Sequence, residues 1–430
     1  MAATQDPKST YGMLSDTGVD RLRQQLGIQY DDATPPHNYE GHMDAFRHMA
    51  NGYGDGNRLW SDRAYAKTTR WGGLIAPPMF VTSMGEKGAP APSPEQKAAL
   101  RGDPLAGLGS YQAVQEFEWS APVREGDHLT SSCALVGVVP KANSAFSGST
   151  VGEMRAWVMR NQKGETVVLR RGTWIRAERH ASAERKKTYE LPQPYSPEQL
   201  AEIDATYAAE TIRGAETRYW EDVQPGEELQ TIVRGPLRTT DIVVWHAGVG
   251  MGITPPGAFK LSYDVRAKVP GLFTPNALNV PDTVQRLHWE KEWANQLGIP
   301  ISYDYGAIRE AILTNLVTNW MGDDGWLWKL SCQHRKFVYQ GDTYWVKGRV
   351  KDKAITEAGA EVRLEIWVQN QWGTITSPGE AIVLLPTRDK AAALPKAGEK
   401  DVQRIFDQEV ERNRPLDSGV SVERKAEAVE

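Results

Sequence analysis

Cysteine is scarce in this chain: its 430 residues include only Cys133 and Cys332, which lie far apart in the sequence. Two isolated cysteines exclude a disulfide framework and a cysteine-based zinc site, and they are typical of a protein of the reducing cytoplasm. Apolar runs of about 18 residues are also missing, so we expect no membrane span. The first residues lack the basic and apolar segments of a secretory signal. We therefore expect a cytoplasmic protein with no membrane partner.

A surplus of positive charge is missing as well. The chain has 50 Lys and Arg against 55 Asp and Glu, which gives a net charge of −5. Without a basic surplus to neutralise phosphates, nucleic acid is not an expected partner. Glycine (39) and proline (26) are close to average use, which excludes collagen-like and wholly disordered chains. Tryptophan (15) is abundant, and each large ring needs an apolar cavity or a flat partner.

The chain contains an internal repeat with a long and uneven period. The matching segments follow in the same order in both halves: 44–50 with 241–247, 60–66 with 288–294, 74–78 with 302–306, 124–129 with 339–344, and 161–164 with 370–373. The offset rises from 197 at the first pair to 228 at the second. This change predicts an insertion of 31 residues in the second copy, between Ala247 and His288.

Both copies pass from a glycine-punctuated segment to a helix and then to several strands, which predicts an α+β fold with an antiparallel sheet wrapped around the helix. The helix of the second copy is expected at 307–320, where apolar residues recur every four positions. We predict an N-terminal domain at 30–180, a helical linker at 181–217, a C-terminal domain with the insertion at 218–388, and a polar tail at 389–430.

The chain resembles the MaoC-type hot-dog dehydratases in four segments, RYWEDVQPGEEL, RTTDIVVWHAG, HWEKEWANQLGIPISYDYG and RKFVYQGDTYWVKGRV. It is similar to their two-domain FAS1-like dehydratase branch in APP followed by MF, and in NWMGDDGWL. The resemblance covers roughly residues 30–385. It implies a double hot-dog, with two long helices each wrapped by a sheet and the two sheets joined side by side.

The resemblance also implies an activity. Members of the family are hydro-lyases of the (R)-specific enoyl-CoA hydratase type, which reversibly add water to 2-enoyl thioesters of coenzyme A or of acyl carrier protein. They use no cofactor beyond the thioester carrier, and double hot-dogs can assemble into homo-oligomers. The family motif, G-D-x-N-P-x-H-x-D, uses an Asp and a His five residues apart to hold and deprotonate the water.

The first copy departs from this motif. Asp55 and Asn57 match it, but Trp60 stands at the position of the His, and Pro77–Pro78 replace a His-Gly pair at the helix entrance. Indole cannot serve as a general base, and proline has no N–H to offer a substrate. The resemblance therefore implies that Trp60, Asp55 and Asn57 bind substrate, chiefly its acyl chain, without catalysing the reaction.

The second copy has His288 at the motif position and Gly306 at the helix entrance. Its motif Asp is absent, and Asp282, one residue out of register, is the nearest substitute. We expect His288 to act as general acid and base, with Asp282 as its partner. The N–H of Gly306 should bind the enolate oxygen, because the amino end of a helix favours negative charge. Tyr303 and Tyr305 should contact the substrate.

Each of these residues also has a purely structural interpretation. His288 could instead be an interface histidine and Asp282 a helix N-cap, although the register of the repeat favours catalysis for His288. For Asp55 in the first copy, the structural interpretation as a turn residue is the favoured one. No cluster of metal ligands is in register, so no metal site is expected. Two other functions stay open: a hot-dog acyl-CoA thioesterase, in which a carboxylate activates water, and a non-catalytic subunit of a heteromeric hydratase.

Overall fold

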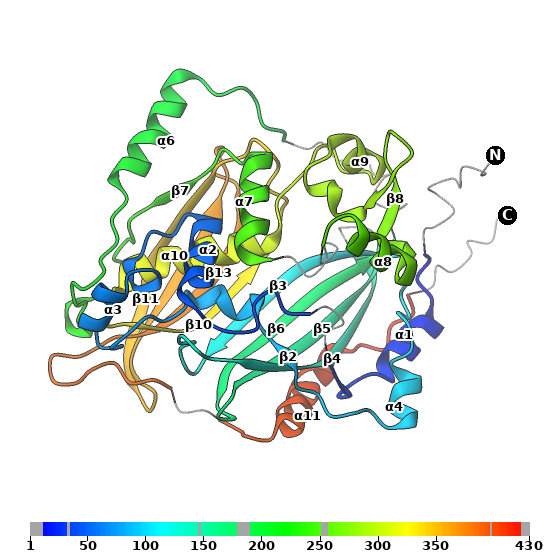
Figure 1. Ribbon diagram of the computed structural model, residues 1–430, viewed down its shortest axis with the longest axis horizontal. Helices are drawn as coiled ribbons and strands as arrows, with labels where there is room; N and C mark the ends of the chain where they lie inside the picture. Colours follow the sequence, from blue (N-terminus) through cyan, green and yellow to red (C-terminus); the bar gives the residue numbers. More distant parts are fainter. Residues whose placement is uncertain are drawn as a thin grey trace.

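One continuous sheet forms the framework of the molecule (Figure 1). In the described part of the chain this sheet has eleven strands, in the order β1-β4-β5-β6-β3-β10-β13-β12-β11-β7, with β2 attached to β4. The N-terminal half supplies the strands up to β3, and the C-terminal half supplies the rest. The computed structural model describes residues 12–31, 35–144, 148–178, 190–250, 257–395 and 398–422.

The elements of the N-terminal half surround its four long strands. Its strands are β1 (Gln29–Tyr30), β2 (Glu86–Lys87), β3 (Gly109–Trp119), β4 (Leu129–Ser144), β5 (Gly148–Asn161) and β6 (Thr166–Ala177). Its helices are α1 (Asp16–Arg23), α2 (Met43–Tyr53), α3 (Arg63–Thr68) and α4 (Pro94–Ala99), and its 3-10 turns are η2 (Arg58–Trp60) and η3 (Pro78–Ser83). Helix α6 (Pro197–Ala209) follows, within the range predicted for the helical linker.

The C-terminal half repeats this order and adds an insertion. Its strands in the large sheet are β7 (Ile232–Arg234), β10 (Trp326–Gln333), β11 (Tyr344–Thr356), β12 (Gly359–Gln369) and β13 (Ile375–Leu384). Its helices and 3-10 turns are η4 (Trp220–Asp222), α7 (Thr239–Val249), η6 (Val284–His288), α9 (Lys291–Gln296) and α10 (Gly306–Met321). The insertion contains α8 (Lys260–Lys268), η5 (Pro270–Leu272) and the hairpin of β8 (Phe273–Pro275) and β9 (Pro281–Thr283), while residues 251–256 lie outside the described part.

The repeat is confirmed at its turns. In both halves an Asn side chain closes the hairpin between the last two long strands. Asn161 Oδ1 accepts hydrogen bonds from the backbone N–H groups two and four residues further on, at 3.0 and 3.1 Å, and Asn370 Oδ1 does the same at 3.2 and 3.0 Å. Gly164 and Gly373 each have a φ of 77°, a conformation that favours glycine. Matching sequence letters therefore encode matching turn geometry.

Helix α10 is the buried centre of the C-terminal half. It ends at Gly322, whose φ is 71°, and all its residues from Ile308 to Met321 are buried. A helix of 16 residues spans about 24 Å. The helix expected at 307–320 is therefore confirmed, and a helix buried on every side is surrounded by protein along its whole length.

Among its described residues, the N-terminal half has no comparable helix. At the equivalent position stands η3, a 3-10 segment of six residues that begins at Pro78 and is followed by Gly85, with a φ of 118°. Pro77 and Pro78 remove two N–H groups from its start, and the positive φ of Gly85 ends the helical path. The double hot-dog is confirmed, but with one long central helix in place of the two that the family resemblance implies.

The two halves share one sheet and one core. Strand β10 pairs with β3, from Lys329 opposite Glu118 to Gln333 opposite Val114. The main apolar cluster contains side chains of both halves, so the halves are parts of a single packed unit.

The C-terminal tail returns to the N-terminal half. Helix α11 (Val402–Asn413), which precedes η7 (Arg414–Leu416), buries Ile405 and Phe406 against apolar residues of β4 and β5. Glu409 pairs with Arg171 of β6 at 2.7 Å. The tail expected to be polar therefore has one buried apolar face. Among the described helices, none combines the length and the apolar character needed to cross a bilayer.

Candidate active site

His288 is the last residue of the turn η6, and Trp60 is the last residue of the matching turn η2. The side chain of Thr283 starts η6 by accepting a hydrogen bond from Gln285 N at 3.2 Å. His288 is only 7% exposed, and its Nδ1 lies 2.9 Å from the carbonyl oxygen of Tyr303. Since a carbonyl can only accept, Nδ1 carries the proton and Nε2 of the neutral ring keeps its lone pair.

Burial decides the protonation state of His288. Desolvation lowers the pKa of the imidazole to about 4, although backbone groups of Tyr303 and Asp304 act in the opposite direction. The ring is therefore neutral at physiological pH. A neutral imidazole whose tautomer is set by a backbone carbonyl has the form that a general base requires.

Aromatic rings enclose this imidazole. The ring centroid of Tyr305 lies 3.7 Å from that of His288, and the centroid of Tyr303 lies 4.8 Å away. The ring centroid of His246 of α7 lies 5.2 Å from that of Tyr305 and 5.7 Å from that of Trp289. Burial also lowers the pKa of His246. The structure thus brings His288, Tyr303 and Tyr305 together, as expected, and adds a second histidine.

Asp282 is held on the inserted hairpin. Its carboxylate accepts hydrogen bonds from Thr283 N at 2.7 Å and from Asn276 Nδ2 at 3.4 Å. Arg286 fixes the hairpin to the motif segment, because its guanidinium donates to Thr274 Oγ1 at 2.8 Å. Among the described residues, no hydrogen bond joins Asp282 to His288. The geometry therefore supplies His288 with a backbone partner, and a catalytic role for Asp282 stays a prediction.

Gly306 begins α10 beside this aromatic group. Its predecessor Tyr305 is the N-cap residue, and no side chain caps the helix. An uncapped helix start leaves backbone N–H groups that can bind an anion. Burial raises the pKa of Tyr305, whose hydroxyl stays protonated.

The equivalent site of the N-terminal half is closed by its own side chains. The indole N–H of Trp60 donates to Asp55 Oδ2 at 2.9 Å, and Asn57 N donates to Asp55 Oδ1 at 2.9 Å. Asn57 Nδ2 donates to Asp323 Oδ1 at 3.2 Å. Burial raises the pKa of Asp55, while the hydrogen bonds that it accepts from Asn57 N and from the Trp60 indole act to lower it. Trp60 therefore occupies the position of a catalytic histidine and satisfies the carboxylate that such a histidine would face.

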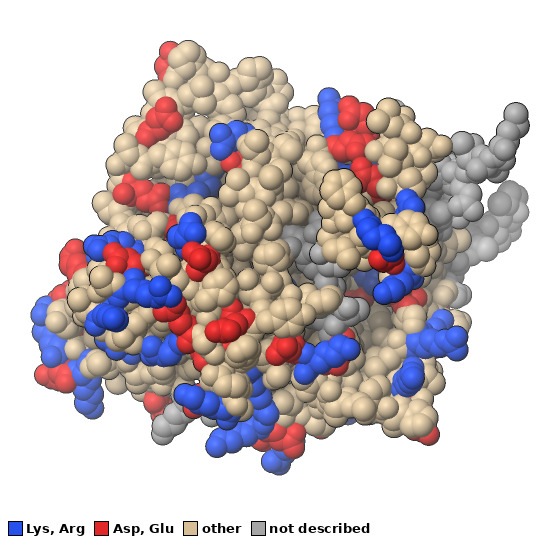
Figure 2. Space-filling view, in the orientation of Figure 1, with Lys and Arg blue, Asp and Glu red and all other residues tan. Residues whose placement is uncertain are grey.

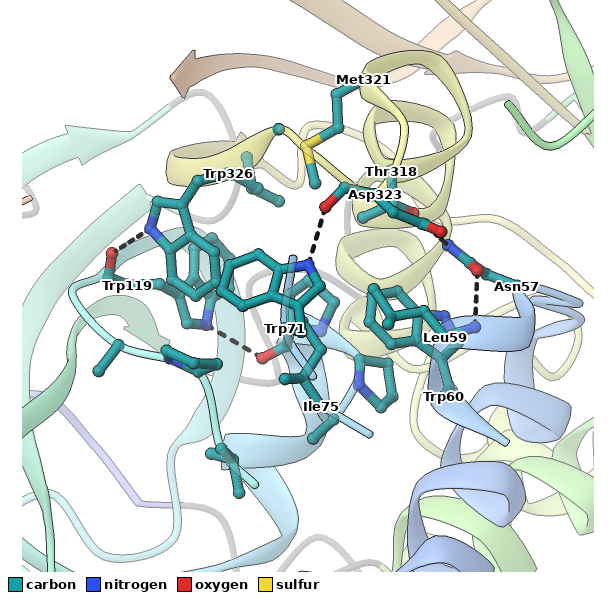
Figure 3. A pocket seen from close by; sticks show the side chains of 18 of the residues that line it. Asn57, Leu59, Trp60, Trp71, Ile75, Trp119, Thr318, Met321, Asp323 and Trp326 are labelled. Carbon is teal, nitrogen blue, oxygen red and sulfur yellow. Dashed lines mark hydrogen bonds between the residues drawn. The ribbon is translucent and has the colours of Figure 1, made fainter. Parts of the chain in front are cut away.

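A small pocket, partly open to solvent, lies next to Trp60 at the carboxyl end of α10 (Figure 3). Its tryptophans turn their N–H groups into the wall: Trp71 donates to the Asp323 carbonyl at 2.8 Å, Trp119 to the Pro78 carbonyl at 3.0 Å, and Trp326 to the Trp119 carbonyl at 2.9 Å. The pocket is therefore lined mainly by apolar groups, the tryptophan rings together with aliphatic side chains. It lies about one helix length, roughly 24 Å, from Gly306.

The residues singled out in the sequence thus form two groups at opposite ends of α10. His288, Tyr303, Tyr305 and Gly306 lie at its amino end, and Asp55, Asn57 and Trp60 lie near its carboxyl end. The structure adds four titratable side chains near the amino end that the sequence did not identify as site residues: His246, Asp304, Glu310 and His334. No motif in the sequence marks these four residues, because each is isolated in an apolar or mixed segment.

The charges around these sites are mixed. Lys and Arg alternate with Asp and Glu over the face shown in Figure 2, without a field of one sign. Among the described residues, no three His, Cys, Asp or Glu side chains are grouped closely enough to hold a metal ion.

Comparisons with known proteins agree with the fold. Residues 35–170 match the family model described as FAS1-like, dehydratase domain region. A UPF0336 protein of Streptomyces avermitilis is 30% identical over 146 residues, which are 33% of this chain and 86% of that protein. A UPF0336 protein of Streptomyces coelicolor matches to the same extent. A solved structure described as a MaoC-like dehydratase superposes with a TM-score of 0.55 at 16% identity, covering 85% of this chain and 99% of the other.

Proposed function

Because this chain belongs to the MaoC-like dehydratase family and includes a FAS1-like dehydratase region, we propose that it adds water reversibly to a 2-enoyl thioester. Membership of the family supports a hydratase or dehydratase role in general. The proposal assigns the reaction to the amino end of α10, with His288 as general base and acid.

The observation that carries the proposal is the state of His288. Its Nδ1 is engaged by the Tyr303 carbonyl at 2.9 Å, its pKa is lowered to about 4, and it stacks on the tyrosine that precedes Gly306. In the hydration direction, Nε2 takes a proton from water while the water oxygen bonds to C3 of the enoyl group. The same proton then passes from Nε2 to C2, and the imidazole returns to its neutral form.

The developing enolate needs hydrogen-bond donors. The backbone N–H of Gly306 at the uncapped start of α10 would supply one, reinforced by the helix dipole. Tyr303 and Tyr305 would pack against the enoyl group, with the protonated Tyr305 hydroxyl as a further donor. Asp55, Asn57 and Trp60 lie at the far end of the helix, so we leave them out of the proposed thioester site.

The test follows the ultraviolet absorbance of 2-octenoyl-CoA mixed with the purified protein. Hydration removes the conjugated enone band without releasing free thiol. We expect His288→Ala to slow this loss by at least about 100-fold, the usual contribution of a general acid-base group. His128→Ala, a change at an exposed histidine in a turn, is the matched control and should leave the rate unchanged.

Other outcomes favour the alternatives. Release of free thiol at the same rate as the loss of substrate means that the protein is a thioesterase. No change with any chain length, on coenzyme A or on acyl carrier protein, favours a non-catalytic subunit. The specific observation for this alternative is that no carboxylate in the described part of the chain is hydrogen-bonded to His288. Either result would refute the hydratase proposal.

A further inference from the structure

Helix α10 buries two charged residues close to its amino end, where the proposed oxyanion donor lies. Arg309 is 3% exposed and Glu310 is fully buried. Burying a charge costs free energy unless partners compensate for it. Arg309 lies 2.9 Å from the carboxylate of Asp304 in an ion pair. Glu310 has different partners, and these come from both halves of the molecule.

The partners of Glu310 stand on either side of the junction between the halves. Gln112 of β3 donates its Nε2–H to Glu310 Oε1 at 2.5 Å, and His334, directly after β10, lies with Nε2 3.1 Å from the same oxygen. Burial lowers the pKa of His334, so the ring is neutral and Nε2 carries the proton that it shares with the carboxylate. His334 N also donates to the Ala113 carbonyl at 2.8 Å, which holds the two strands together at this point.

The same side chains press against Gly306. A Cβ added at Gly306 would lie 2.8 Å from Gln112 Oε1 and 3.0 Å from His334 Nε2, closer than ordinary contacts allow. A side chain at position 306 would therefore displace Gln112 or His334. Gln112 and His334 thus border the first residue of α10, which no side chain caps, and Glu310 holds both of them through its Oε1 atom.

The network also keeps polar atoms that a purely structural contact would not need. Glu310 Oε2 and His334 Nδ1 are buried and have no hydrogen-bond partner among the described residues. Burying a polar atom without a partner is unfavourable, because the atom loses its hydrogen bonds to water. An apolar trio of similar volume would hold the strands together without this cost, which argues for a role beyond packing.

We propose that Gln112, Glu310 and His334 are positioning residues for the oxyanion donor, and this inference rests on the proposed function. They act through Gly306, whose N–H they hold in line with the thioester oxygen. A displacement of about 1 Å at a reacting group can cost about 100-fold in rate. The N-terminal half would thus contribute to catalysis through Gln112, although its own motif has lost the histidine.

A spectroscopic readout separates positioning from a merely structural role. The dienoyl thioester 2,4-hexadienoyl-CoA absorbs at longer wavelength when its carbonyl oxygen is hydrogen-bonded, because polarisation extends the conjugated system. The shift of the bound probe therefore reports the oxyanion donor without requiring turnover. His288→Ala should keep the shift and lose hydration, since His288 acts on water and not on the carbonyl.

The test compares Gln112→Ala and Glu310→Gln with a matched control at the other end of α10. Gln112 is partly exposed, so its truncation leaves the core filled, and Glu310→Gln keeps an acceptor oxygen. We expect Gln112→Ala to lower kcat by about 10- to 100-fold with KM unchanged and to reduce the absorption shift, with a smaller loss for Glu310→Gln. Asp323→Asn, which weakens an equally buried link to Asn57 and Tyr65, should change neither quantity.

Two results would overturn the inference. If folded Gln112→Ala and Glu310→Gln proteins keep the wild-type kcat and absorption shift, the network is structural only and the proposed function stands. If the wild-type protein neither hydrates 2-octenoyl-CoA nor shifts the absorption of 2,4-hexadienoyl-CoA, the proposed function fails and the inference fails with it.

Discussion

Among single residues, His288 shows most clearly how surroundings set chemistry. The same imidazole in water would have a pKa near 6.5 and would be partly charged in an acidic compartment. Here burial between Tyr303, Tyr305 and the protein interior keeps it neutral. Its partner is a backbone carbonyl, so its orientation does not depend on the protonation of a carboxylate.

This environment predicts the pH dependence of the reaction. The neutral form is the active base and protonation removes it, so kcat/KM should stay flat on acidification until the pH approaches about 4. The measurement is a pH profile of kcat/KM for hydration of 2-octenoyl-CoA. An acid limb centred near pH 6.5 would mean that the working histidine is exposed, and would contradict the assignment of His288.

The sequence predicted part of this site. His288, Tyr303, Tyr305 and Gly306 could be found because the repeat and the family motif align them along one segment. Glu310, His334 and Gln112 could not, because they come from a helix, a strand end and a strand of the other half. The position of Asp282 depended on how the inserted hairpin folds back, and this is decided by contacts of Arg286 with backbone carbonyls that no motif records.

At the scale of elements, the two halves differ most in their central helices. The sequence predicted α10 from its four-residue apolar period, which was the right criterion for a helix packed along its whole length. The first copy offered only a short apolar stretch after two prolines, and the structure contains the six-residue turn η3 there. The repeat was therefore a good guide to the order of elements and a poor guide to their length.

The start of α10 should be sensitive to a single added methyl group. Gly306→Ala places a Cβ against Gln112 and His334, and overpacking of this kind costs about 1–3 kcal/mol. Urea unfolding should show this loss in the free energy of unfolding. Gly73→Ala, where an added Cβ meets no atom, is the control and should be close to neutral.

A double variant checks the cause of that loss. Gly306→Ala combined with Gln112→Ala removes one of the two side chains that the new Cβ meets, so part of the stability should return. If the losses of the two single variants simply add, then Gln112 does not restrict position 306. Such additivity would also weaken the case for positioning of the helix start.

At the scale of the whole molecule, the pairing of β3 with β10 joins the strands of the two repeats into one continuous sheet. The strands pair over five residues, and the Trp326 indole of one half donates to the Trp119 carbonyl of the other at 2.9 Å. Separating the halves would expose two strand edges and the shared apolar cluster. The sequence predicted two domains, and because their core is shared we expect them to fold as one unit.

Chain separation tests this unity. We expect a fragment of residues 1–195 and a fragment of residues 196–430 each to be unfolded or aggregated when produced alone, and to form a folded complex when produced together. Circular dichroism and gel filtration of the purified fragments measure this directly. Two separately folded, monomeric fragments would show that the junction of β3 and β10 is dispensable.

Helix α11, which packs on the N-terminal half, has a consequence for folding during synthesis on the ribosome. The sheet of the N-terminal half is complete in sequence at Ala177, yet part of its outer face is covered by Ile405 and Phe406. At a synthesis rate of about 5–20 residues per second, that face waits some tens of seconds for its cover. During this interval the face is an exposed apolar surface on a growing chain. Chaperones that bind apolar surfaces can bind it until α11 has been synthesised.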